Sequence, residues 1–166
     1  METTVYREWS EKAANNALRL AEEARILFEA ERLPRAYYLA HMSTEESAKS
    51  ILLCTMSQLG TPASELQKVI ALLRNHRKKI EFVVSYAASQ SPALGGQLSG
   101  LQEQLIAHIN DLKNNTMYVS CDQGAVLTPD EKVSGIPVST HLGAAESLAS
   151  FANSLLTLPS RGSSKG

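Results

Sequence analysis

The sequence predicts an all-α fold, an antiparallel four-helix bundle with a shorter C-terminal helix. Along most of the chain, apolar residues recur at the three-to-four-residue spacing of an amphipathic helix. Proline or glycine stands where most of these patterns stop, as is typical of helix ends. The 166 residues, 43% of them hydrophobic, are enough for one domain with its own core. We therefore expect one helical domain over residues 1–158 and a flexible C-terminal tail at 159–166.

The first two helices are predicted on either side of Pro34. The first covers about residues 4–31, and its apolar side carries Tyr6, Trp9, Ala13, Ala17, Leu20, Ala24, Leu27 and Phe28. The second runs from Arg35 to about Leu59, and Gly60 is the residue that ends it. One side of this second helix collects the apolar residues Tyr38, Met42, Leu52, Met56 and Leu59.

Two more long helices are expected before the C-terminal part of the chain, where strand and turn signals appear. Thr61 followed by Pro62 fits an N-cap and a proline at the first helical position, so the third helix should begin there. It extends to about Ser89 and is followed by a loop rich in Gly and Ser. The fourth helix covers about residues 97–117, with Leu98, Leu101, Leu105, Ile109, Leu112 and Thr116 on one side.

The C-terminal part of the chain combines strand, turn and helix signals. The stretch "MYVSCDQGAVL" is rich in β-branched residues and contains Gln123-Gly124, which predicts a short hairpin or an extended excursion. "TPDE" at 128–131 fits a capping box that opens a short helix ending near Gly135. A last helix over about residues 140–157 should pack across the others.

Polar side chains interrupt three of these apolar stripes. On the second helix Glu45 falls in the middle of the apolar side, Lys49 lies four residues on, and Glu46 flanks them. Asn16 interrupts the first stripe, and His76 interrupts the third. Charges on an inner face cost several kcal/mol unless they are paired. Because antiparallel packing gives these residues similar heights, we expect one interhelical polar cluster, which Lys113 approaches from an end. Such a cluster is either a buried network that fixes helix register or a functional site.

The stretch "RNHRKKIEF" surrounds His76 with four cations, Arg74, Arg77, Lys78 and Lys79. They form either a solvated face or a surface that binds RNA phosphates or an acidic partner. No aromatic residues alternate with these cations, as they do in many proteins that bind single strands.

Composition excludes several classes of function. A net charge of −1 provides no global attraction for nucleic acid or anionic membranes. Cys54 and Cys121 form neither a disulfide framework nor a zinc pattern, and the four histidines lack ligand spacing, so no metal or cofactor is expected. No apolar run approaches the roughly 18 residues of a membrane span, and no signal peptide is seen. We expect a cytoplasmic protein without membrane contact.

The stretch "ANNALRLAEEARILFEAERLPRAYYLAHMSTEESAK" resembles the first two helices of the AbiV family of abortive-infection proteins, members or near relatives of the HEPN superfamily. The shared motifs are Asn16-Ala17 in the first helix and Glu45-Glu46-Ser47-Ala48-Lys49 in the second. A histidine followed by basic residues in the third helix matches 76–79. Lys113, "MYVSCDQG" and Pro129 match the pattern that follows, so the resemblance covers about residues 10–135.

The resemblance implies a HEPN-like helical bundle, usually dimeric, in a phage-defence or toxin system. Apolar residues in excess of one stripe (Tyr37 beside Tyr38, Ile51 and Leu53) are consistent with a homodimer. Many HEPN relatives are metal-independent ribonucleases that carry an Arg, four to six residues, and then a His near the last long helix. Here that segment has Lys113 and Tyr118 and no histidine. The other formal match, Arg35 to His41, begins the second helix.

The first functional hypothesis is a HEPN-type toxin that acts on RNA or on translation as a metal-independent ribonuclease. Metal-free RNA cleavage needs a general base and a cation. His76 with Lys49, Lys79 or Lys113 would supply them, and Tyr118 with Glu45 or Glu46 would orient them. Its partners would be RNA and an antitoxin or phage protein. The second hypothesis is a non-catalytic dimeric module that binds a protein partner, in which the polar cluster only sets register.

Overall fold

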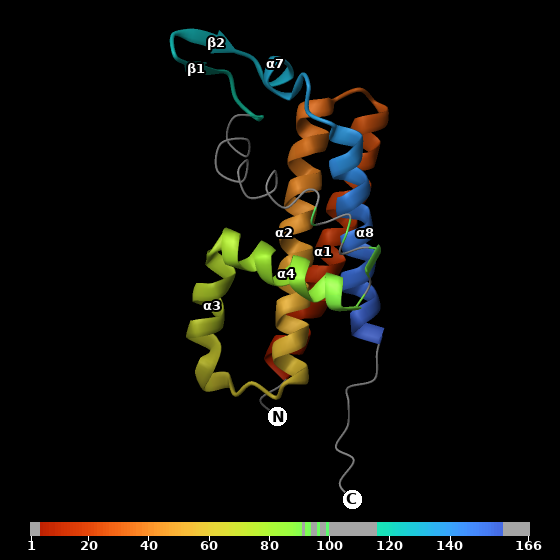
Figure 1. Ribbon diagram of the computed structural model, residues 1–166, viewed down its shortest axis with the longest axis vertical. Coiled ribbons are helices and arrows are strands. Elements are labelled where there is room, and N and C mark those ends of the chain that lie inside the picture. Colours follow the sequence, from red (N-terminus) through yellow and green to blue (C-terminus); the bar gives the residue numbers. More distant parts are fainter. Residues whose placement is uncertain (1–3, 91, 94–95, 97–98, 100–115, 158–166) are drawn as a thin grey trace, which may run out of the picture.

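Three long helices form the body of the part of the chain that the structure describes. In the computed structural model, which describes residues 4–90, 92–93, 96, 99 and 116–157, helices α1 (Thr4–Glu29) and α2 (Leu33–Gln58) form an antiparallel pair, and α8 (Val138–Thr157) lies against both (Figure 1). The turn between α1 and α2 uses Glu31 at φ 57°, and Pro34 occupies the first turn of α2. The predicted helical fold is therefore confirmed.

Small residues bring α1 and α2 into close contact. The α1 residues that face inward are mostly alanines no more than 4% exposed, namely Ala13, Ala14, Ala17, Ala21 and Ala24. The Ser10 hydroxyl donates to the Ser50 carbonyl at 2.8 Å, and the Ser50 hydroxyl donates back to the Ser10 carbonyl at 2.9 Å. Ser43 likewise donates to the Ala17 carbonyl at 2.8 Å. Since each hydroxyl reaches the backbone of the opposite helix, the two helix axes must be close.

Helix α2 is buried on nearly all sides, because α1, α8 and α4 (His76–Gln90) each contact a different part of its surface. The single apolar side predicted for it is therefore wrong: Leu59 is 73% exposed, whereas Tyr37, Ile51 and Leu53 are no more than 2% exposed. These last three residues belong to the core of this chain, so they no longer support a homodimer.

The predicted third helix is two helices. A short 3-10 turn (Ala63–Glu65) leads into α3 (Leu66–Arg74), and α4 begins after a break at Asn75, where ψ is 93°. Asn75 Oδ1 accepts a hydrogen bond from the Lys78 amide at 3.1 Å, so Asn75 caps the new helix. Gly60 ends α2 at φ 66°, as predicted, but Thr61 makes no N-cap, because its hydroxyl lies 3.5 Å from Met56 Sδ.

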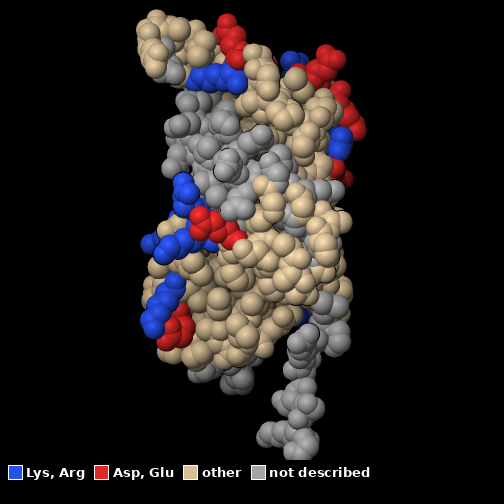
Figure 2. All heavy atoms as spheres, in the orientation of Figure 1, with Lys and Arg blue, Asp and Glu red and all other residues tan. Residues whose placement is uncertain are grey.

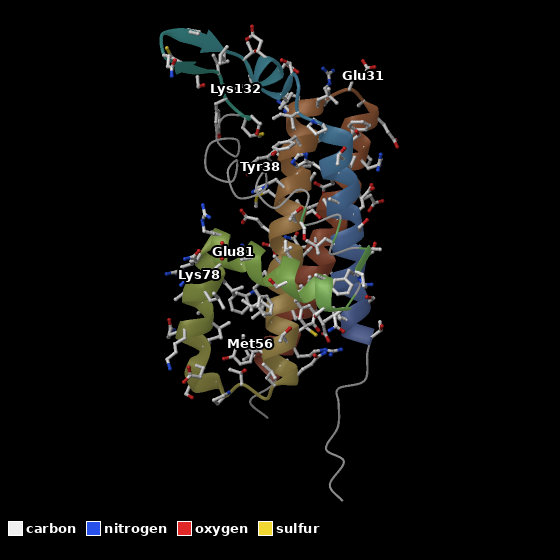
Figure 3. All side chains as sticks on the ribbon, in the orientation of Figure 1. Glu31, Tyr38, Met56, Lys78, Glu81 and Lys132 are labelled. Atoms are coloured by element: carbon white, nitrogen blue, oxygen red, sulfur yellow. The ribbon has the colours of Figure 1, made fainter. Side chains whose placement is uncertain are left out.

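Two apolar clusters attach α3 and α4 to the bundle. Val69 and Leu73 of α3 pack with Tyr6, Leu52 and Leu53, and Figure 3 shows Met56 at this contact. Val83 and Val84 of α4 share a second cluster with residues of α2 and α8, namely Ala48, Ile51, Cys54, Leu148, Ala152 and Leu155. The α3–α4 segment therefore rests on the bundle at two separate places.

The C-terminal signals form the predicted structures. Strands β1 (Ser120–Asp122) and β2 (Ala125–Leu127) make an antiparallel hairpin around Gln123 and Gly124, both at positive φ. Thr128 and Glu131 form the capping box of α7 (Pro129–Val133), and Gly135 follows at φ 95°. Nearly all of the helix predicted at 97–117, and the predicted tail at 159–166, lie outside the described residues. Within the part of the chain that is described, no helix is long and apolar enough to cross a membrane.

The close α1–α2 contact leads to a first prediction. Ala17 is fully buried beneath Ser43, so Ala17→Leu should force the two helices apart and lower the free energy of unfolding by about 1–3 kcal/mol. Asn16→Leu is the matched control, because Asn16 is the exposed neighbour, and it should change stability by less than about 0.5 kcal/mol. Urea denaturation measures both; equal losses would contradict the contact.

Candidate functional site

A buried carboxylate lies where α4 crosses α2. Glu45 Oε1 is 3.3 Å from His41 Nε2, and Glu45 Oε2 is 3.4 Å from Lys79 Nζ. The three residues are 6%, 7% and 2% exposed, respectively. We call these residues the buried triad. Two of them come from one face of α2 and the third from α4, so the triad joins the bundle to the α3–α4 segment.

Local structure explains how the triad forms. His41 and Glu45 are four residues apart on α2, so their side chains are neighbours on one face. Lys79 follows the break at Asn75 and lies in the first turn of α4. The break sets the direction of α4 independently of α3. Lys79 can therefore point at α2 even though Arg77 and Lys78 are exposed.

The electrostatics of the triad are balanced. Burial lowers the pKa of the Lys79 ammonium, and the Glu45 carboxylate opposes this change. Glu46 and Lys49 are close enough to act on Lys79 with opposite signs. The formal charges of the two glutamates and the two lysines cancel. Removing Glu45 or Lys79 alone would upset this balance in a poorly solvated place.

The pairing differs from the prediction in one respect. Lys49 was expected to pair with Glu45, four residues before it, but its ammonium donates instead to the carboxylate of Glu46. This second pair lies at the edge of the site, with side chains 24% and 16% exposed. Lys79 takes the place beside Glu45 because α4 covers that face of α2, and this leaves Lys49 nearer to solvent.

Other predicted members lie elsewhere. Asn16 is exposed, so its assignment to the polar cluster is wrong: α1 turns its alanines toward α2 and leaves Asn16 facing solvent. His76 is the first residue of α4, although its side chain, like the whole of Lys113, falls outside what the structure describes. Tyr118 is 69% exposed in the segment before β1. Figure 1 places that hairpin near the α1–α2 turn, whereas α4 crosses α2 farther along.

Three of the four predicted cations form an exposed group where α3 meets α4. Arg74, Arg77 and Lys78 are exposed, and we call them the cationic corner. Figure 2 shows basic side chains gathered at this corner, and Figure 3 shows Lys78 and Glu81 there. Arg77 lies 4.0 Å from Glu81. Lys79 points inward to Glu45 and is not on this surface.

His41 was not predicted as a partner of Glu45. The available signal was its position one turn before Glu45 on the same face, although a spacing of four residues is common on solvated helices too. A cleft of about 370 Å³ lies at the α1–α2 turn, and none of the predicted site residues lines it. Its walls are Glu31, Arg32, Pro34, Arg35, Thr116, Met117, Pro129 and Asp130.

No three His, Cys, Asp or Glu side chains among the described residues are grouped to hold a metal ion.

Comparison with known protein families gives a match over most of the chain. The family model described as AbiV, within the HEPN group, matches residues 5–150 of this chain. No curated protein and no solved structure matches it significantly. The matched region includes the buried triad, the cationic corner and the hairpin.

The buried triad leads to a prediction about stability. Glu45→Gln and Lys79→Met should each lower the free energy of unfolding by about 3–5 kcal/mol, because each breaks a buried ion pair by removing one of its two charges. The double variant should lose less than the sum of the two single losses. The control is the cycle of Glu46→Gln and Lys49→Met at the more exposed pair, where losses of about 1 kcal/mol or less are expected. Urea titration of all the variants measures the coupling energy of each pair. Equal coupling energies for Glu45–Lys79 and Glu46–Lys49 would contradict the stronger pairing expected in the triad.

Proposed function

The chain belongs to the AbiV family, a family of abortive-infection proteins of phage defence, and we propose that it acts in this defence on RNA or on translation. The observation that carries the proposal is the cationic corner. Arg74, Arg77 and Lys78 are exposed together at a helix break, and RNA presents a regular row of phosphates that such cations bind. The chain as a whole has a net charge of −1, so this attraction is local.

A metal-independent cleavage fits the proposal. His76 begins α4 between Arg74 and Arg77, so its imidazole is next to the proposed phosphate surface in the sequence. In the proposed reaction His76 removes the 2′-hydroxyl proton, the 2′-oxygen attacks phosphorus, and the 5′-oxygen leaves with a proton. Lys49 or Lys113 stabilises the developing negative charge, and Glu46, which pairs with Lys49, orients that ammonium. The burial of Glu45 and Lys79 gives them positioning roles in this scheme.

The proposal also includes partners. A homodimer is what the family implies, and an antitoxin or a phage protein would hold the effector inactive or release it. The exposed hairpin and the cationic corner lie at different places on the molecule, so both are free to make separate contacts (Figure 1).

One observation favours a second candidate, a non-catalytic interaction module. Glu45 and Lys79 are so deeply buried that the triad is closed to a substrate in this conformation. In that case the triad fixes the position of α4 and the cationic corner binds an acidic protein. The two candidates differ in whether RNA is bound and cleaved.

The RNA contact predicts a specific salt dependence. The double variant Arg77→Gln/Lys78→Gln should weaken binding of a short single-stranded RNA at low salt. It should also lower the slope of log affinity against log salt by about 0.7 for each lost phosphate contact. The matched control is Lys12→Gln/Arg19→Gln, which removes two exposed cations from α1. Fluorescence anisotropy at several salt concentrations measures the slopes; an equal fall in both variants would rule out a localised site.

The toxin proposal predicts growth arrest that depends on His76. Expression of the wild-type chain should stop bacterial growth and cleave cellular RNA, and His76→Ala should abolish cleavage while the protein still accumulates. RNA sequencing of cleavage ends measures this directly. If the wild type arrests growth with intact RNA, the ribonuclease version fails and the interaction module is favoured. If it neither arrests growth nor cleaves RNA, with and without phage infection, the toxin proposal fails.

A further inference from the structure

The α3–α4 segment, residues 63–90, is attached to the bundle differently from the other helices. It leaves α2 through Leu59, which is 73% exposed, and through Gly60 at φ 66°. Its two helices are separated by the break at Asn75. Figure 1 shows α3 standing beside the bundle while α4 crosses it. We call this segment the arm.

In the described part of the arm few apolar side chains are fully buried; Leu66, Leu72, Phe82 and Tyr86 pack on the two clusters but stay half-buried. Among the described residues, α1, α2 and α8 supply 21 of the buried hydrophobic residues, whereas α3 and α4 supply four. These four are Val69, Leu73, Val83 and Val84. Burial of apolar surface is the main source of stability, and segments with little of it open before the rest of a protein does. The arm therefore needs less free energy to detach than the bundle needs to unfold.

The buried triad lies between the two apolar contacts of the arm. Lys79 is the only charged residue that the described part of the arm buries, and it meets Glu45 and not another arm residue. A buried ion pair contributes little net stability, because desolvation offsets the attraction, but one that loses a partner becomes costly. Such a pair specifies one closed position of the arm without making that position very stable.

We propose that α3 and α4 open from the bundle together as a hinged arm, and that contact of Lys79 with Glu45 and His41 is the latch that holds it closed. The hinge is the Leu59–Pro62 connection. Opening returns Lys79, Glu45 and His41 to water and uncovers the α2 and α8 residues beneath Val83 and Val84. It also moves the cationic corner away from α2. If the proposed action on RNA is correct, the latch thereby controls where the phosphate-binding cations are held.

The chain contains its own reporter for this motion. Cys54 is 1% exposed and shares an apolar cluster with Val83 and Val84 of the arm. Cys121 on the hairpin is exposed. In a Cys121→Ser background, a thiol reagent such as DTNB therefore reports when Cys54 becomes accessible. The assay contains no RNA, so its outcome is independent of the proposed function.

The experiment compares a latch variant with a bundle variant. Lys79→Met should speed the reaction of Cys54 with DTNB on the order of 100-fold, with little dependence on urea and unchanged far-UV circular dichroism. Restoring the balance with Glu45→Gln/Lys79→Met should slow the reaction again. Ala17→Leu, which destabilises the α1–α2 contact, should leave the rate almost unchanged. The proposal is overturned if the labelling rates of all variants simply follow their free energies of unfolding.

Hydrogen exchange on the wild-type chain gives a second measurement that needs no folded variant. Amides of residues 66–90 should exchange together, at lower protection than those of α1, α2 and α8. Equal protection in the arm and the bundle would also overturn the proposal.

Discussion

The close contact between α1 and α2 is the constraint on which the other packing depends. Alanines on α1 and serines on both helices place small side chains over much of this interface, and the hydroxyls of Ser10 and Ser50 donate to carbonyls across it. A contact this close hides one face of α2 completely. Helices α8 and α4 then cover the remaining faces, so α2 becomes the central element of the domain. Most polar residues of such a central helix are buried, and each buried one needs an internal partner.

The polar residues of α2 find these partners in two ways. Thr44, Ser47 and Thr55 donate to carbonyls one turn earlier on the same helix, at 3.1, 2.8 and 2.9 Å, which satisfies them locally. Glu45 has no such local solution, because a carboxylate only accepts hydrogen bonds. It needs donors, and those described are His41 on its own helix and Lys79 on α4. This buried carboxylate therefore contributes, together with the apolar cluster of Val83 and Val84, to where α4 is placed.

Local signals in the sequence predicted local structure well. The helix ends at Gly60 and Gly135, the Gln123-Gly124 hairpin and the Thr128–Glu131 capping box depend on residues within a few positions of one another, and all of them form. The break at Asn75 was missed because the apolar period continues through it. Asn16 was placed wrongly because the spacing of apolar residues locates the inward side of a helix only to within about one residue. The inward side of α1 consists mostly of alanines, and it is narrower than a side made of large aliphatic residues would be. The partner of Glu45 could not be predicted, since Lys79 lies 34 residues away and its direction depends on that break.

The four cations at 74–79 show why charge runs are hard to interpret from sequence. In an unbroken helix, Arg74, Arg77, Lys78 and Lys79 would surround the axis, and none would differ from the others. The cap at Asn75 starts a new helix whose rotation is set by Lys79 reaching Glu45. Once Lys79 faces inward, Arg77 and Lys78 must face outward, because side chains one or two positions apart lie on different sides of a helix. One buried contact thus divides a uniform basic stretch into a structural residue and an exposed surface, and the geometry of that surface depends on the contact remaining closed.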